Sequence, residues 1–235
     1  MNDIHSTAII EEGAKIGDEN VIGPYTVIDK TVIIGDNNIF GAGCHLINNV
    51  MVGDNNKFGS HVVIGGNGEI KEESIFSGWV IIGDGNFINH HVSIDRPVKH
   101  TTEIGDNNYI MVKSHIAHDC IVEDDVIMSS GNILGGHTIL LQGCNLGLGV
   151  VTHQYTTIGQ YSMIGMNTTV SKDISPFMKV VGSPPKCIGL NEFKLDILDC
   201  SGYTEEVIDT ILRSEMYGLF LIQSNRRGRV LEYEL

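Results

Sequence analysis

Residues 33–52 read IIGDNNIFGAGCHLINNVMV, and a large apolar residue returns at every sixth position: Ile34, Phe40, Leu46 and Val52. The same step holds from residue 4 to residue 94 and, after a slip of phase, from residue 104 to residue 170. Thr152 is the one polar exception along these two runs. A period of six is longer than the periods of an isolated strand or helix, so it indicates a repeated unit.

A second column of small residues lies two positions before the apolar one, as at Asn38, Cys44 and Val50. Residues two apart on a strand point to the same face. Each hexapeptide is therefore predicted to be a short strand with two side chains directed inward. The large residue would fill the interior, and the small residue would fit the crowded corner.

Turn residues set the next level of the repeat. The pattern Gly-Asp-x-Asn occurs at 17–20, 35–38 and 53–56, so it returns after every third hexapeptide. Gly, Asp and Asn tolerate the backbone conformations of a tight corner. Three hexapeptides then make one coil, and the sequence predicts a triangular parallel β-helix of about nine coils over residues 1–175. The period does not determine handedness, although parallel crossovers are normally right-handed.

A different pattern begins after residue 175. Prolines at 176, 184 and 185 indicate a linker, and apolar residues at helical spacing follow it. Asn191 is suited to begin one short helix that ends near Gly202, and Thr204 to begin another. Residues 176–235 are thus predicted to be a linker and a small C-terminal α-helical region.

Composition excludes several classes of function. Lys and Arg number 15 against 29 Asp and Glu, a formal net charge of −14. An acidic chain lacks the basic surface that nucleic acids or anionic membranes require. No apolar run is long enough for a membrane span, and no signal peptide is recognisable. Five cysteines without a CxxC motif favour a reducing compartment. We expect a cytoplasmic protein with neither nucleic-acid partner nor stable membrane insertion.

Polar residues that suit catalysis gather in the later coils. Residues one coil apart should stack on one face, which places His118, Gly136 and Gln154 in one column. Asp119 and His137 fall in the next column, and His115 and His153 lie nearby in the sequence. A neutral imidazole is a suitable general base, an adjacent carboxylate can orient it, and a backbone N–H can stabilise an oxyanion. The set therefore favours acyl transfer to a hydroxyl or amine.

Two other interpretations compete with catalysis. The histidines could simply be surface residues of a non-catalytic scaffold, since ten histidines are spread over the chain. The second competing interpretation is a histidine metal site, as in a carbonic-anhydrase-like metal protein. The His-x-x-x-His spacing is absent, and His115 and His118 should lie on different sides of a turn. We predict no metal and no bound cofactor.

Three segments carry a resemblance to a known family. The string His115-Ile116-Ala117-His118-Asp119-Cys120, the segment Gly135-Gly136-His137 and the pair His153-Gln154 resemble the UDP-N-acetylglucosamine acyltransferases. The resemblance covers nearly the whole chain and implies a left-handed β-helix. It also implies transfer of an acyl group from an acyl carrier protein thioester to the 3-hydroxyl of UDP-N-acetylglucosamine, the first step of lipid A biosynthesis.

The resemblance assigns roles to residues of this chain. His118 would be the general base, Asp119 its orienting partner and Gly136 the oxyanion donor. The substrate-binding set would be His115, His137, His153, Gln154 and Met166, with the bulk of Met166 limiting acyl-chain length. Members of the family are homotrimers with the site between neighbouring chains.

Some segments depart from the family pattern. The loop 68–73 is short and acidic, and Asp95 stands where the family has a histidine. An expected arginine pair is missing near residue 200, and Arg226, Arg227 and Arg229 could substitute for it. These departures leave open an N-acyltransferase that uses an amino-sugar nucleotide for O-antigen or surface polysaccharide, with coenzyme A or acyl carrier protein as donor.

Overall fold

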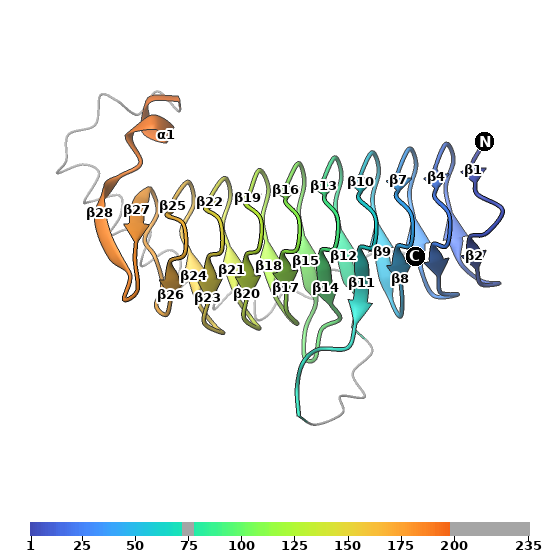
Figure 1. The fold of residues 1–235 in the computed structure, drawn as a ribbon, viewed down its shortest axis with the longest axis horizontal. Coiled ribbons are helices and arrows are strands. Elements are labelled where there is room, and N and C mark those ends of the chain that lie inside the picture. Colours follow the sequence, from blue (N-terminus) through green and yellow to red (C-terminus); the bar gives the residue numbers. More distant parts are fainter. Residues whose placement is uncertain (72–77, 198–235) are drawn as a thin grey trace.

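The computed structural model describes residues 1–71 and 78–197, and within them almost all regular structure is short parallel strand. The strands stack into a tube of three sheets (Figure 1). This is the predicted left-handed parallel β-helix, with about ten turns. Each strand pairs with the equivalent strand of the next turn, so that Ile22 faces Phe40 and Ile28 faces Leu46.

From β1 to β26 the three sheets take the strands in rotation. Sheet A contains, in spatial order, β1 (Asp3–Ile4), β4 (Val21–Ile22), β7 (Ile39–Phe40), β10 (Lys57–Phe58), β13 (Phe87–Ile88), β16 (Tyr109–Ile110), β19 (Ile127–Met128), β22 (Asn145–Leu146), β25 (Met163–Ile164), β27 (Met178–Val181) and β28 (Lys186–Leu190). Sheet B contains β2 (Ile9–Ile10), β5 (Val27–Ile28), β8 (His45–Leu46), β11 (Val63–Gly66), β14 (Ser93–Asp95), β17 (His115–Ile116), β20 (Ile133–Leu134), β23 (Val151–Thr152) and β26 (Thr169–Val170). Sheet C contains β3 (Lys15–Ile16), β6 (Ile33–Ile34), β9 (Val50–Val52), β12 (Val80–Ile82), β15 (Thr102–Ile104), β18 (Ile121–Val122), β21 (Ile139–Leu140) and β24 (Thr157–Ile158).

The core consists of the two inward columns that the sequence predicts. Ile34, Phe40 and Leu46 of the large column are buried, as are Asn38 and Cys44 of the small column. The buried asparagines form a ladder in which the Asn38 N–H donates to the side-chain oxygen of Asn20. Most of these buried amides are satisfied by the ladder, although Asn108 Nδ2 and Asn132 Oδ1 have no hydrogen-bond partner within the described ranges.

Two insertions interrupt the stacking on the same stretch of the tube. In a regular turn, residue 68 would pair with Val50. Val80 takes that place instead, so this turn contains two extra hexapeptides. A whole number of hexapeptides explains why the apolar period continues through the insertion. Ile70 lies in this loop and is exposed, so its apolar character does not reflect a core position. In the next turn, residue 98 would regularly pair with Val80, but Thr102 does so. This shorter insertion accounts for the slip of phase after residue 94.

A hairpin and a short helix follow the last turns of the tube. β27 extends sheet A in parallel beside β25, and β28 returns antiparallel to β27, inside the segment predicted as a linker. Helix α1 (Glu192–Ile197) follows Asn191, whose carbonyl accepts from the Lys194 N–H. The second expected helix and Arg226, Arg227 and Arg229 lie outside the described residues, and the division at residue 175 stays a prediction. No helix in the described ranges is long and apolar enough to cross a membrane.

Candidate active site

The corner between sheets B and C positions the candidate residues. Asp119, His137 and Tyr155 occupy it on successive turns with φ of 59°, 60° and 63°. Asp and His adopt this left-handed region more readily than most residues. Backbone hydrogen bonds fix the stacking, since the His137 N–H donates to the His118 carbonyl and the Tyr155 N–H to the Gly136 carbonyl. The predicted columns are therefore present.

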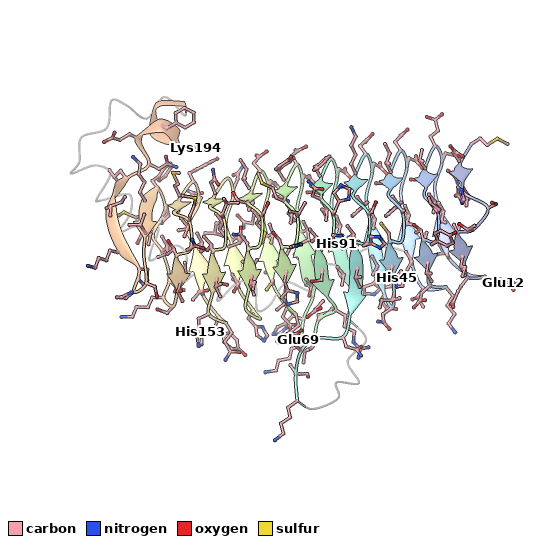
Figure 2. The ribbon with its side chains drawn as sticks, viewed as in Figure 1. Glu12, His45, Glu69, His91, His153 and Lys194 are labelled. Carbon is pink, nitrogen blue, oxygen red and sulfur yellow. The ribbon has the colours of Figure 1, made fainter. Side chains whose placement is uncertain are left out.

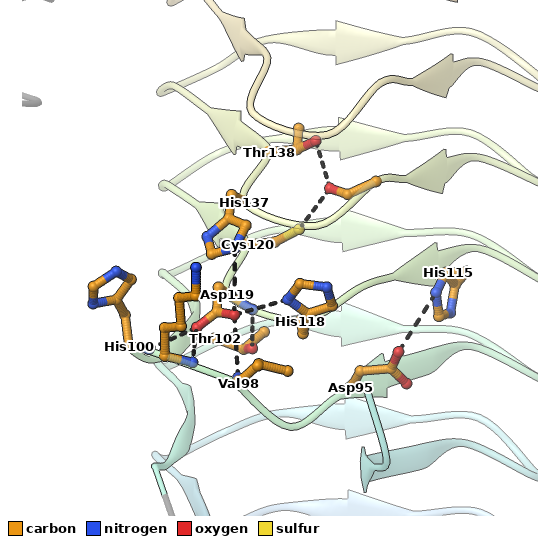
Figure 3. Close-up of polar contacts among 12 residues, drawn as sticks. Asp95, Val98, His100, Thr102, His115, His118, Asp119, Cys120, His137 and Thr138 are labelled. Carbon is orange, nitrogen blue, oxygen red and sulfur yellow. Dashed lines mark hydrogen bonds and ion pairs between the residues drawn. The ribbon is translucent and has the colours of Figure 1, made fainter. Parts of the chain in front are cut away.

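His118 and Asp119 form a hydrogen-bonded pair. His118 Nδ1 lies 2.8 Å from Asp119 Oδ2 (Figure 3). The imidazole is 14% exposed, whereas the carboxylate is fully buried. Because an ionised carboxylate can only accept, Nδ1 carries the hydrogen, and the lone pair of neutral His118 is at Nε2. This tautomer is the one a general base needs.

The Asp119 carboxylate also anchors the loop formed by the shorter insertion. Its oxygens accept from the backbone N–H groups of Val98, Lys99 and His100 at 3.1, 2.9 and 2.6 Å. Burial raises the pKa of Asp119, but the hydrogen bonds from the His100 N–H, the His118 ring and the other two amides outweigh it. The net effect lowers its pKa below the usual value, so Asp119 is ionised beside His118 at neutral pH.

Gly136 lies directly against the His118 ring. A Cβ built at residue 136 would come within 2.6 Å of His118 Cε1 and 2.7 Å of Nε2, closer than any side chain tolerates. Only glycine fits over the base. Within the described chain its N–H has no hydrogen-bond partner. A donor near Nε2 that no protein group uses is suited to stabilise an oxyanion.

Three further rings extend the site from His118. The His137 ring meets the His118 ring edge to face at 5.2 Å and stacks on Tyr155 at 4.3 Å. His100 approaches His137 at 6.2 Å between ring centroids. Burial lowers the pKa of His137, an effect that the Asp119 charge opposes and the neighbouring His118, Lys99 and His100 reinforce. The ring is therefore neutral at pH 7.

The same three side chains could be considered as metal ligands. Ligand atoms of His118, Asp119 and His137 lie within 4.8 Å of one another. A carboxylate offers about four lone-pair positions. Three backbone amides and the His118 ring already use four at Asp119. The chemistry of this carboxylate favours an orienting role over metal ligation, and the absence of a metal stays a prediction.

His115 belongs to a second group beside the first, on sheet B. Its Nδ1 lies 2.8 Å from Ser93 Oγ, and its Nε2 lies 3.7 Å from Asp95 Oδ2. Figure 3 shows His115 and Asp95 to one side of His118. Burial lowers the pKa of His115, and the Glu69 charge partly offsets that effect. Separation of His115 from His118 by a turn was expected from their spacing.

The remaining candidates are exposed. His153 and Gln154 lie on the same corner one turn beyond Gly136, and His153 Nδ1 is 3.0 Å from the Gln154 carbonyl oxygen. Met166 is 67% exposed and lies between β25 and β26, on the corner between sheets A and B. A single chain does not bring Met166 to His118, so a shared site would need a neighbouring chain.

Sequence reasoning did not find several contributors to the site. His100 and Lys99 reach the corner through the second insertion, and Ser93 and Asp95 contact His115 from the preceding turn. The slip of phase after residue 94 was the available signal, because an insertion at a corner can fold over a neighbouring rung.

Comparison with known proteins agrees with this geometry. Residues 31–66 match the family model "Bacterial transferase hexapeptide (six repeats)". An acyl-[acyl-carrier-protein]–UDP-N-acetylglucosamine O-acyltransferase of Thiobacillus denitrificans is 39% identical over 91% of this chain and 83% of its own. The chain belongs to the UDP-N-acetylglucosamine acyltransferase family. The Syntrophobacter fumaroxidans member is also 39% identical, over 80% of this chain and 74% of its own.

Solved structures of UDP-N-acetylglucosamine acyltransferases share the fold. The Francisella novicida enzyme aligns with a TM-score of 0.82 and 31% identity, covering 89% of this chain and 77% of its own. The Bacteroides fragilis enzyme aligns with a TM-score of 0.82 and 30% identity, covering 90% of this chain and 83% of its own. The family expected from the histidine segments is confirmed.

Proposed function

We propose that this protein transfers an acyl group from an acyl carrier protein thioester to the 3-hydroxyl of UDP-N-acetylglucosamine. The observation that carries the proposal is the His118–Asp119 pair with Gly136 packed on the ring. Relatives named for this reaction support the choice of substrates. The reaction would belong to lipid A biosynthesis in the cytoplasm.

The proposed mechanism needs no covalent enzyme intermediate. His118 Nε2 removes the hydroxyl proton while the oxygen attacks the thioester carbonyl, and ionised Asp119 stabilises the imidazolium that forms. The Gly136 N–H donates to the developing oxyanion. When the tetrahedral intermediate collapses, the His118 proton passes to the departing thiolate. The ester and the free phosphopantetheine thiol are the products.

The other residues are proposed to hold the substrates. His115, His137, His153 and Gln154 line the corner around His118 or lie one turn beyond it, where the sugar nucleotide and the acyl chain would bind. Met166 is proposed to limit the acyl chain from a neighbouring chain. This arrangement needs a neighbouring copy of the chain, and we propose a homotrimer as the working assembly.

The test is product analysis by mass spectrometry. The protein is offered UDP-N-acetylglucosamine and amino-sugar nucleotides, each with acyl carrier protein and coenzyme A thioesters. We expect a 3-O-acyl product from UDP-N-acetylglucosamine with the carrier protein donor. His118→Ala should slow its formation by about 10²-fold or more, while His45→Ala, at an exposed histidine elsewhere on sheet B (Figure 2), should not. N-acyl products alone would contradict the proposal.

A further inference from the structure

Two neighbouring residues of the shorter insertion, Lys99 and His100, are fixed to the wall of the tube by their backbone. Their N–H groups donate to Asp119 Oδ1 at 2.9 and 2.6 Å, and the Asp119 carboxylate is fully buried. Hydrogen bonds to an ionised acceptor are among the stronger ones in proteins, so this stretch of backbone is well anchored. Both residues are exposed, and their side chains therefore leave a fixed backbone toward the solvent.

Both side chains act on the corner that holds the proposed base. The His100 ring meets the His137 ring edge to face at 6.2 Å, and His137 meets His118 at 5.2 Å. In Figure 3 the His100 ring lies outside the ribbon of the turns. Burial lowers the pKa of His137, and the charges of His118, Lys99 and His100 act in the same direction. Lys99 and His100 thus border the place where an acceptor would meet His118.

The chain supplies no anion for these two side chains within residues 1–71 and 78–197. Neither Lys99 nor His100 forms an ion pair there. Of the described carboxylates, only that of Asp119 acts on His137. Its oxygens already accept from three loop amides and lie beside the His118 ring. The outer side of this corner therefore presents positive charge and N–H donors to a ligand.

The acceptor of the proposed reaction carries a diphosphate that suits these groups. The chain has a formal net charge of −14, which repels an anionic substrate unless cations are placed where it binds. A lysine offers three N–H donors with a full charge, and an imidazole offers an N–H in either protonation state. The diphosphate is joined directly to the sugar whose hydroxyl would face His118. The phosphate of the acyl donor lies at the far end of an extended pantetheine arm, so the position beside the base favours the acceptor.

We propose that Lys99 and His100 bind the diphosphate of the acceptor. This inference rests on the acyl transfer proposed above and adds the residues that hold the anionic end of the nucleotide sugar. Lys99 would neutralise a phosphate, and the His100 ring would donate to a phosphate oxygen. Because Asp119 holds both this loop and the His118 ring, one carboxylate would set the distance between the anion site and the base.

The first test separates the two KM values in steady-state assays with UDP-N-acetylglucosamine and acyl carrier protein thioester. Lys99→Gln removes the charge but keeps the backbone N–H that holds Asp119, so the KM for the acceptor should rise about tenfold, whereas the KM for the donor should stay within about twofold. His100→Ala should raise the acceptor KM about threefold. Lys99→Arg keeps the charge and should remain near the wild type. Lys30→Gln removes an equal charge from an exposed site on the same corner, between β5 and β6, and should change neither KM.

The second test measures the Kd of UDP by calorimetry, which needs no acyl transfer. Salt screens exposed charges, so raising the ionic strength from about 0.05 to about 0.5 M should weaken UDP binding to the wild type more steeply than to a variant that combines Lys99→Gln and His100→Ala. Equal affinity and equal salt dependence in the two proteins would overturn the inference. A rise in the donor KM alone, or a loss of kcat with an unchanged acceptor KM, would overturn it as well.

Failure of the proposed function would be visible separately. A wild-type protein that transfers no acyl group to any nucleotide sugar would contradict that function. The calorimetric comparison would still decide whether Lys99 and His100 bind a nucleotide diphosphate.

Discussion

Replacing Gly136 by alanine is expected to disable the base without removing any catalytic atom. The new methyl would lie 2.6 Å from His118 Cε1, where ordinary contact begins at 3.4 Å, so the ring has to move by about 0.8 Å. Asp119 holds the ring at 2.8 Å, and the move would stretch that hydrogen bond. A misplacement near 1 Å costs on the order of 10²-fold in rate. Overpacking also destabilises a protein by about 1–3 kcal/mol.

The assay is single-turnover acyl transfer at saturating acceptor, with thermal unfolding measured in parallel. Gly131→Ala is the control, because its φ of 73° strains an added side chain by about 1 kcal/mol, yet a Cβ there meets nothing within 4 Å. It should lower stability and leave the rate intact. In a His118→Ala background, Gly136→Ala should lower the single-turnover rate by less than threefold, because the ring that the new methyl would displace is absent. A Gly136→Ala enzyme with the wild-type rate would refute the reasoning.

Three other expectations follow from the same contacts. Asp119→Asn replaces one acceptor oxygen by a donor, so kcat should fall by about 10²-fold or more, and a change below threefold in steady-state assays would contradict the orienting role. Because the folded pKa of Asp119 is lowered, its stabilisation is complete above its unfolded pKa of about 4 and is lost as the pH falls through the lowered value. The gap in unfolding temperature between wild type and Asp119→Asn should accordingly be present at pH 7 and shrink below about pH 4. Met166→Gly removes an exposed side chain and should lengthen the acyl chain chosen in a competition among carrier-bound thioesters, and an unchanged choice would exclude Met166 from the acyl site.

The repeat made most of the fold predictable. A period of six with two inward columns left one arrangement for the strands, and the turn of three hexapeptides placed His118 and Gly136 on one corner. The hand of the helix came only from the family resemblance, because the period is the same for either hand. Ile70 shows the reverse problem, since an insertion of two hexapeptides preserves the period without adding to the core.

The site was predictable only where it follows the repeat. Periodicity places residues on rungs and carries no information on how an inserted loop folds. The amides of residues 98–100 reach Asp119 by leaving the regular coil. Gly68 likewise approaches His118 so closely that a Cβ there would lie 3.2 Å from His118 Cβ, although the two segments are distant in the sequence.

The most direct test of the account is the chemical step of His118→Ala at saturating substrates. A general base contributes about 10²–10⁴-fold, so kcat should fall by that factor. Thermal unfolding is measured in parallel, because the loss of the His118 ring also removes one hydrogen bond from buried Asp119 and should lower stability. A His118→Ala enzyme that retained the wild-type kcat would contradict the central claim that this imidazole, oriented by Asp119, takes the proton from the acceptor.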